Sequence, residues 1–245
     1  MFDLIRDVTM LGQSTLPKKT LYQVAGWTLI VEFFLLLCPL VILGSAINWP
    51  QTLGDPANVM LPLIHEKAAS VRWGYLIYLV YSILFWPVAL LTNKVFTLGG
   101  MRSVWLRIAM GFGLASMVAR CLGIIRWVVA MPALAALYVN SASSETREAI
   151  TVVYQALNDY AGSVGEVLGV SLFAALWLAI VSLVILQTKI VPHWLGFWGL
   201  VSAVLLVTQL AETFGIDLGG FITVPVTVVQ FWFLALGIVL LRSAR

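Results

Sequence analysis

The sequence predicts an all-α, polytopic membrane protein whose helical bundle crosses the bilayer about six times. Of its 245 residues, 61% are apolar and only 10% are charged, whereas soluble domains contain about a quarter charged residues. The apolar residues form six long runs, separated by stretches rich in polar and turn-forming residues. Because a hydrocarbon core of about 30 Å needs roughly 20 helical residues, each run is long enough to cross it.

The six runs can be placed along the chain in order. The first is longer than the roughly 7–15 apolar residues of a secretory leader, so we expect it to be retained as a span. The third has no polar break at which the chain could turn back, and we expect a kink or an end near Pro132. The loops leave no room for a soluble domain, which favours a single membrane domain over residues 1–245. The spans are expected at about 24–46, 73–91, 104–131, 164–187, 195–214 and 221–241.

The basic residues predict the orientation of the bundle. Cytoplasmic segments of membrane proteins carry an excess of Lys and Arg. With the N-terminus inside, nine basic residues fall on the cytoplasmic side and three on the outer side, which favours an N-in, C-in topology. The inner set is Arg6, Lys18, Lys19, Lys94, Arg102, Arg107, Lys189, Arg242 and Arg245, and the outer set is Lys67, Arg72 and Arg147.

Two outer loops have recognisable content. Residues 48–70 contain several prolines and are expected to form an irregular strap. In the second loop, Ser144 can cap a helix that has Glu145 and Glu148 in its first turn. The sequence therefore predicts an amphipathic helix over about 144–160 that lies on the outer membrane surface and leads into the fourth span. Its apolar face would consist of Ile150, Val153, Leu157 and Tyr160.

Charged residues inside the spans form the candidate site. A charge within the bilayer costs about 2.5–3.5 kcal/mol on insertion scales, so it usually faces the protein interior and has a partner. Helix rise places Arg120 and Arg126 in the outer half of the third span. Glu166 reaches that depth from the fourth span, and Gln209 and Glu212 reach it from the fifth. We therefore expect one of these arginines to contact one of the two glutamates.

This charge cluster has two interpretations. The pairs could only fix how the helices pack, and Gly165 and Gly169 form a GxxxG pair that allows close helix approach. Alternatively, Arg120 and Arg126 could bind an anionic or amphipathic ligand in a polar pocket, with the carboxyl groups orienting it or moving protons.

Glu32 stands apart, in the inner half of the first span, where no basic residue is expected at its depth. One interpretation is a protonated carboxyl group that is hydrogen-bonded to Gln187 or Gln230. The other is a role in proton handling.

Several classes of site lack support in the sequence. His65 and His193, the only histidines, fall on opposite sides of the membrane and so cannot jointly bind a haem. Cys38 and Cys121 lie inside apolar runs, without metal-ligand spacing. Phosphate-binding loops and nucleophile elbows are absent, and the scattered basic residues do not favour nucleic-acid binding. We therefore predict no catalytic residue, no metal ligand and no cofactor.

Three stretches suggest a family. They are DPANVMLPL after the first span, ARCLGIIRW in the third and VPHWLGFWGL at the start of the fifth. Together with the six-span layout, they resemble the bacterial integral membrane family labelled domain of unknown function 4386, over nearly the whole chain. The resemblance implies a six-helix protein of the bacterial plasma (inner) membrane and carries over no catalytic residue. Members of that family tend to have a basic residue at the position of His193.

Three classes of function remain open. The short loops favour a non-catalytic protein, either a small sensor or an accessory subunit of a membrane assembly. The second class is a transporter or carrier built around Arg120, Arg126 and Glu166. The third is a membrane-embedded enzyme that uses Glu32 or Glu166 as an acid, as a distant similarity in size and acid placement to small membrane terpene cyclases implies. The expected partners are the lipid bilayer and other membrane subunits or a lipophilic ligand.

Overall fold

The computed structural model describes residues 17–98, 100, 104–216 and 218–244, and every regular element in these ranges is a helix. Six helical stretches are long and apolar enough to cross a membrane, which confirms the predicted all-α fold with six spans. Arg6, Arg102 and Arg245, which enter the charge count above, lie outside the described residues. The spans are α2 (Lys18–Ile47), α4 (Ala68–Leu98), α5 (Val104–Val128) with α6 (Ala130–Asn140), α7 (Ser144–Gly162) with η2 (Ser163–Ala174) and α8 (Ala175–Gln187), α9 (His193–Thr208) with η3 (Gln209–Phe214), and α10 (Thr223–Ser243).

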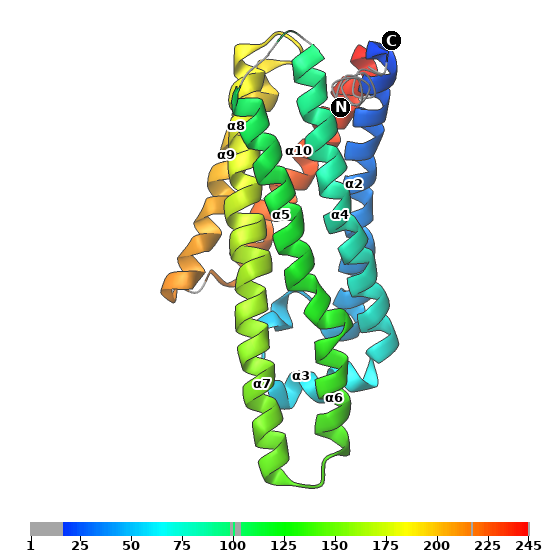
Figure 1. Cartoon of the computed structure of the whole chain (residues 1–245), viewed down its shortest axis with the longest axis vertical. Helices are drawn as coiled ribbons and strands as arrows, with labels where there is room; N and C mark the ends of the chain where they lie inside the picture. The colour runs from blue at the N-terminus through cyan, green and yellow to red at the C-terminus, as the bar shows by residue number, and fades with distance from the viewer. Residues whose placement is uncertain (1–16, 99, 101–103, 217, 245) are drawn as a thin grey trace, which may run out of the picture.

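The spans run side by side along one long axis, and α2 begins at the same end of the bundle at which α10 ends (Figure 1). Helix α2 packs between α4 and α10, α5 packs between α4 and η2, and α9 packs against α8 and α10. Large aromatic side chains fill the centre, where the Phe85 and Trp177 rings meet edge to face at 5.1 Å and Trp232 is fully buried. This aromatic core holds the spans together.

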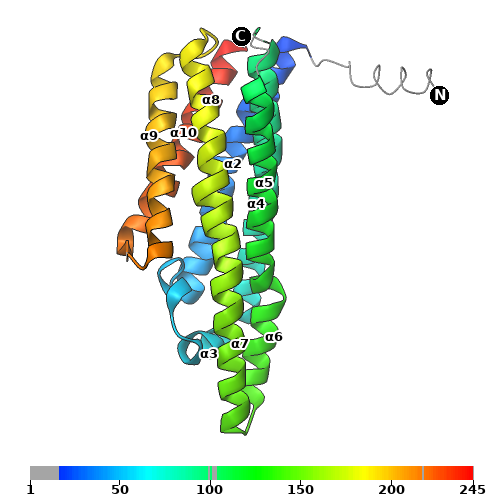
Figure 2. The ribbon, with the colours of Figure 1, turned by 60° about the vertical axis from the view of Figure 1, so that its left-hand side comes forward.

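The spans differ greatly in length. The continuous helix formed by α7, η2 and α8 has 44 residues, whereas α9 with η3 has 22 and α10 has 21. At a rise of 1.5 Å per residue the longest helix measures about 66 Å, roughly twice the thickness of a hydrocarbon core. The third and fourth spans therefore project beyond the level at which the last two spans end (Figure 2).

The projecting part is a helical unit with its own core. It consists of α3 (Ala57–Glu66), α6 and α7, and we call it the distal module. Met60 of α3, Met131 of α6 and Tyr154 of α7 are all fully buried in one hydrophobic cluster there. The Tyr75 and Trp127 rings stack at 4.8 Å in the same cluster, which joins the module to α4 and α5.

The strap between the first two spans is largely helical, so the prediction of an irregular segment over 48–70 is wrong. It contains a short turn, η1 (Gln51–Gly54), and the ten-residue α3, and α4 already begins at Ala68. The buried side chains of α3 pack against α6 and α7. This tertiary packing outweighs the poor helix propensity of Pro62.

Helix α7 begins where the amphipathic pattern places it but runs in a different direction. The prediction that it lies on the membrane surface is wrong, because α7 continues into η2 without a break and follows the long axis in both views (Figures 1 and 2). Its cap is Ser143 rather than Ser144, since Ser143 Oγ accepts a hydrogen bond from the Thr146 N–H at 3.3 Å.

The buried face of α7 also differs from the predicted one. Ile150, Tyr154 and Asn158 are buried, whereas Val153 and Tyr160 are 46% and 74% exposed. The hydrophobic pattern of α7 alone did not locate this face, because the face is determined by how α3 and α6 pack against α7.

The third span is interrupted at Val129, where φ is −114° and ψ is −63°. The interruption precedes Pro132 by three residues. Proline has no N–H to donate to the carbonyl four residues earlier, which here belongs to Val128, the last residue of α5. The break therefore lies one turn before the proline that the sequence analysis singled out.

Candidate functional site

The third span carries both candidate arginines on its buried side. Arg120 and Arg126 are 5% and 7% exposed. They lie six residues, or about 9 Å, apart along α5, and their surroundings differ. Arg126 is bound by polar groups at the junction with the distal module, and Arg120 lies among aromatic rings within the bundle.

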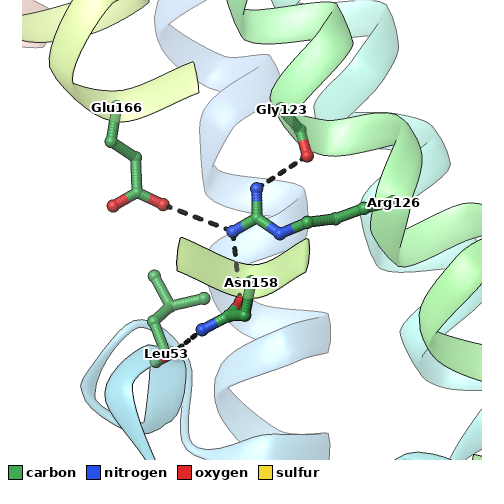
Figure 3. A network of polar contacts seen from close by, with 5 residues as sticks. All are labelled: Leu53, Gly123, Arg126, Asn158 and Glu166. Carbon is green, nitrogen blue, oxygen red and sulfur yellow. Dashed lines mark hydrogen bonds and ion pairs between the residues drawn. The ribbon is translucent and has the colours of Figure 1, made fainter. Parts of the chain in front are cut away.

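Arg126 is the centre of a polar network that joins four elements (Figure 3). Its Nη1 donates to the Gly123 carbonyl at 2.7 Å, and its Nη2 donates to Asn158 Oδ1 at 3.4 Å. Nη2 also lies 3.9 Å from Glu166 Oε1. Asn158 Nδ2 then donates to the Leu53 carbonyl of η1 at 3.0 Å. These five residues, which we call the Arg126 network, connect α5, α7, η2 and η1.

Within this network the ion pair is the weakest link. A separation of 3.9 Å is long for a charge-assisted hydrogen bond, and the Glu166 side chain is 50% exposed. Exposed ion pairs typically contribute about 0–1 kcal/mol. The Arg126 guanidinium is held mainly by its hydrogen bonds and by the Trp127 ring, whose centroid lies 5.5 Å away.

Glycines on the fourth span allow α5 to pack closely against that span near both arginines. A Cβ added to Gly123 would lie 2.6 Å from the Gly165 Cα, and one added to Gly169 would lie 2.8 Å from the Arg120 Cγ. Ser116 Oγ donates to the Gly169 carbonyl at 2.7 Å in the same contact. The GxxxG pair identified in the sequence thus packs against α5, although nothing in the pattern identified Gly123 as its partner.

Arg120 does not form the pair that the sequence analysis considered. Among the described residues it has no carboxylate within 4 Å. Its guanidinium carbon lies 4.6 Å from the Tyr81 ring centroid and 5.2 Å from that of Phe85, and its Nε is buried without a hydrogen-bond partner. Cation–π contacts with these two rings hold the guanidinium in place of a close ion pair.

Glu32 is fully buried, and in the described part of the chain neither of its carboxylate oxygens has a hydrogen-bond partner. The expected hydrogen bond from Gln230 is not formed, because Gln230 Nε2 donates to Tyr81 Oη at 2.6 Å instead. Gln187 is not a partner either, since it lies at the end of α8 and lines a cavity with Lys18.

The environment of Glu32 differs from the expected one in a second respect. Arg120 of α5 interacts with it electrostatically, so a basic residue does accompany Glu32. A proton-handling role for Glu32 stays a prediction.

The fifth-span residues form a separate part of the candidate cluster. The buried Gln209 accepts a hydrogen bond from Ser171 Oγ at 3.3 Å. Glu212 is exposed on η3, and within the described ranges neither Arg120 nor Arg126 lies within 4 Å of it. The structure thus brings Arg126 and Glu166 together and leaves Glu212 apart from both arginines.

Sequence reasoning missed three members of the Arg126 network, namely Leu53, Gly123 and Asn158. Leu53 and Gly123 contribute backbone carbonyls, which any residue type could supply. Asn158 did carry a signal, because an amide at the core-facing position of an otherwise apolar helix face needs a buried partner.

Comparison with known proteins places the chain in a family. No curated protein and no solved structure matches it. The model of a family described as "Domain of unknown function (DUF4386)" matches residues 24–241, a range that contains both arginines and all but the ends of the first and last spans. This chain is therefore a multi-pass membrane protein that belongs to the family of domain of unknown function 4386.

Proposed function

We propose that this protein is a small sensor or accessory subunit of a membrane assembly, located in the plasma membrane with both termini in the cytoplasm. The observation that carries the proposal is the rigid connection between the distal module and the bundle. Two of its three helices, α6 and α7, continue the third and fourth spans, and the Arg126 network ties α5 to α7 and to the strap at the junction.

This connection gives the module a mechanical link to the membrane. Because α7 continues into η2 without a loop, a displacement of the module reaches Glu166 through the helix backbone. The Asn158 side chain passes the same displacement to Arg126 and to the strap at Leu53. Helices that shift as units are a common route by which an event outside the membrane changes the packing within it.

The surface of the module supports a role in contact with another protein. Leu137 of α6 and Val152 of α7 are 60% and 64% exposed, and Tyr160 is 74% exposed. Apolar side chains exposed on a helical unit that projects beyond the bilayer favour contact with a protein partner. The expected partner is another membrane subunit whose extramembrane helix packs against α6 and α7.

A site-specific photocrosslinker would test this role in native membranes. Placed at Leu137 or Val152, it is expected to give the same membrane protein as a discrete adduct from both positions. Thr146 and Arg147 are exposed polar positions that lie on other sides of α7 from Val152, and they serve as controls that should give no such adduct. Adducts with lipid alone, or with unrelated proteins at the two apolar positions, would contradict the proposal.

The orientation can be tested by cysteine labelling. In a background in which Cys38 and Cys121 are replaced by serine, Ser144→Cys is expected to react with an impermeant maleimide in intact cells. Lys94→Cys should react only after the membrane is opened, because it lies at the end of the bundle that is rich in basic residues. The opposite labelling pattern would reverse the topology.

One observation favours a second candidate function, a carrier for an anionic or amphipathic ligand. The half-exposed Glu166 side chain lies beside the buried Arg126, so a ligand arriving at Glu166 could reach the guanidinium. In this case Arg126 would be needed for binding rather than for folding, and its substitution distinguishes the two functions.

A further inference from the structure

A cavity of about 580 Å³ lies at the end of the bundle opposite the distal module. Helix α2 contributes its first turn to the walls, the turn between α8 and α9 contributes three residues, and α10 contributes its last turn. The volume lies within the range of roughly 300–1,000 Å³ that is typical of small-molecule sites. The lining residues are Lys18, Tyr22, Gly100, Gln187, Thr188, Lys189, Ile190 and Ser243.

Two ammonium groups in this cavity have no counter-ion among the residues that the structure describes. Neither Lys18 nor Lys189 forms an ion pair with any described residue, and the Lys18 Nζ lies only over the Tyr22 ring, 5.6 Å from its centroid. The acidic residue of α2 nearest to Lys18 is Glu32, about 21 Å further along the helix. The other acidic residues that the structure describes belong to the strap, α7, η2 and η3, toward the opposite end.

The rest of the lining suits an oxyanion. The Tyr22 hydroxyl and the Gln187 amide are hydrogen-bond donors, and Thr188 and Ser243 add hydroxyl groups. The turn that carries Lys189 is fixed by a contact of 3.0 Å between His193 Nε2 and the Thr188 carbonyl. His193 therefore positions the turn.

We propose that this cavity binds the phosphate group of an anionic phospholipid. Since the apolar spans begin and end at this level, the cavity opens where headgroup phosphates lie. Basic pockets between helices at the cytoplasmic face are suited to such headgroups, and each nearby Lys contributes about 1 kcal/mol to binding. The ammonium groups of Lys18 and Lys189 would contact the phosphate from two sides.

The test compares two double variants of the full chain in detergent by native mass spectrometry. Lys18→Gln with Lys189→Gln removes the two cavity charges. Lys19→Gln with Lys94→Gln removes two exposed charges at the same end that do not line the cavity. With phosphatidylglycerol as the probe, the first variant is expected to bind about 30-fold more weakly than wild type, which corresponds to about 2 kcal/mol. The control should bind as wild type does, and all three should bind phosphatidylcholine equally weakly.

Three results would overturn the site. An equal loss in both variants would mean that binding depends on the overall charge of this end. Phosphatidylcholine that binds as tightly as phosphatidylglycerol would exclude recognition of anionic lipid. Displacement of phosphatidylglycerol by inorganic phosphate at millimolar concentration would assign the cavity to a soluble anion. An unchanged thermal midpoint of the variants shows that they remain folded.

Discussion

Replacing Gly123 by alanine is expected to destabilise the protein by up to about 2 kcal/mol. The added Cβ would lie 2.6 Å from the Gly165 Cα and 2.8 Å from the Ala161 carbonyl oxygen, and both of these atoms belong to the backbone. Because a backbone cannot turn aside as a flexible side chain can, α5 and the fourth span must separate. Overpacking of this kind typically costs 1–3 kcal/mol, which exceeds the gain of about 1 kcal/mol from the better helix propensity of alanine.

Gly111 offers a matched control on the same helix, since a Cβ added there meets nothing within 4 Å. Gly111→Ala is expected to leave stability unchanged or to raise it by up to about 1 kcal/mol. Reversible unfolding of both variants in mixed micelles measures the difference. If the two substitutions had equal effects, the close contact between Gly123 and Gly165 would not hold the spans together.

The second large effect is expected at Arg126. Arg126→Met should cost about 3 kcal/mol, because it leaves the buried Asn158 amide without its donor and removes the bond to the Gly123 carbonyl. Glu166→Gln should cost less than about 1 kcal/mol, because its side chain is half exposed and its contact with Arg126 is 3.9 Å long. The order of these two effects follows from burial rather than from charge.

A double-mutant cycle separates the explanations for Arg126. If hydrogen bonds dominate, the coupling between Arg126→Met and Glu166→Gln should stay below about 1 kcal/mol. A coupling of several kcal/mol would show that the ion pair stabilises the junction after all. If Arg126→Met left the free energy of unfolding unchanged, the Arg126 network would not stabilise the fold. The carrier function would then be the better explanation for the buried arginine.

The sequence predicts the spans well because lipid imposes a simple rule. Every backbone group within the hydrocarbon needs an internal partner, so apolar runs of sufficient length become helices. Counting residues along α5 placed Arg126 and Glu166 at one depth, and the structure brings them within 3.9 Å. The same counting did not reveal that Arg120 interacts electrostatically with Glu32, because residue positions along separate spans do not show which side chains face each other.

The distal module could not be foreseen for a related reason. The predicted third span ends at residue 131, and the apolar residues that follow it had no predicted partner, but Met131 and Ala135 are fully buried against protein. Hydropathy measures the preference of a side chain for leaving water, which is the same whether it enters lipid or a protein core. Whether a side chain of α6 faces lipid or a protein core depends on its contacts with α3 and α7. Residues far apart in the sequence make these contacts, so the local pattern does not show them.

The π-helical character of η2 has a consequence for the link between module and bundle. A π turn contains one residue more than an α turn, because its hydrogen bonds run from i to i+5. Such an extra residue can migrate along a helix without breaking the chain, and each residue that it passes is turned by about 100° around the axis. Glu166 lies inside this twelve-residue segment. A change of register within η2 would therefore rotate the Glu166 carboxylate away from Arg126, while α7 and α8 kept their own helical geometry.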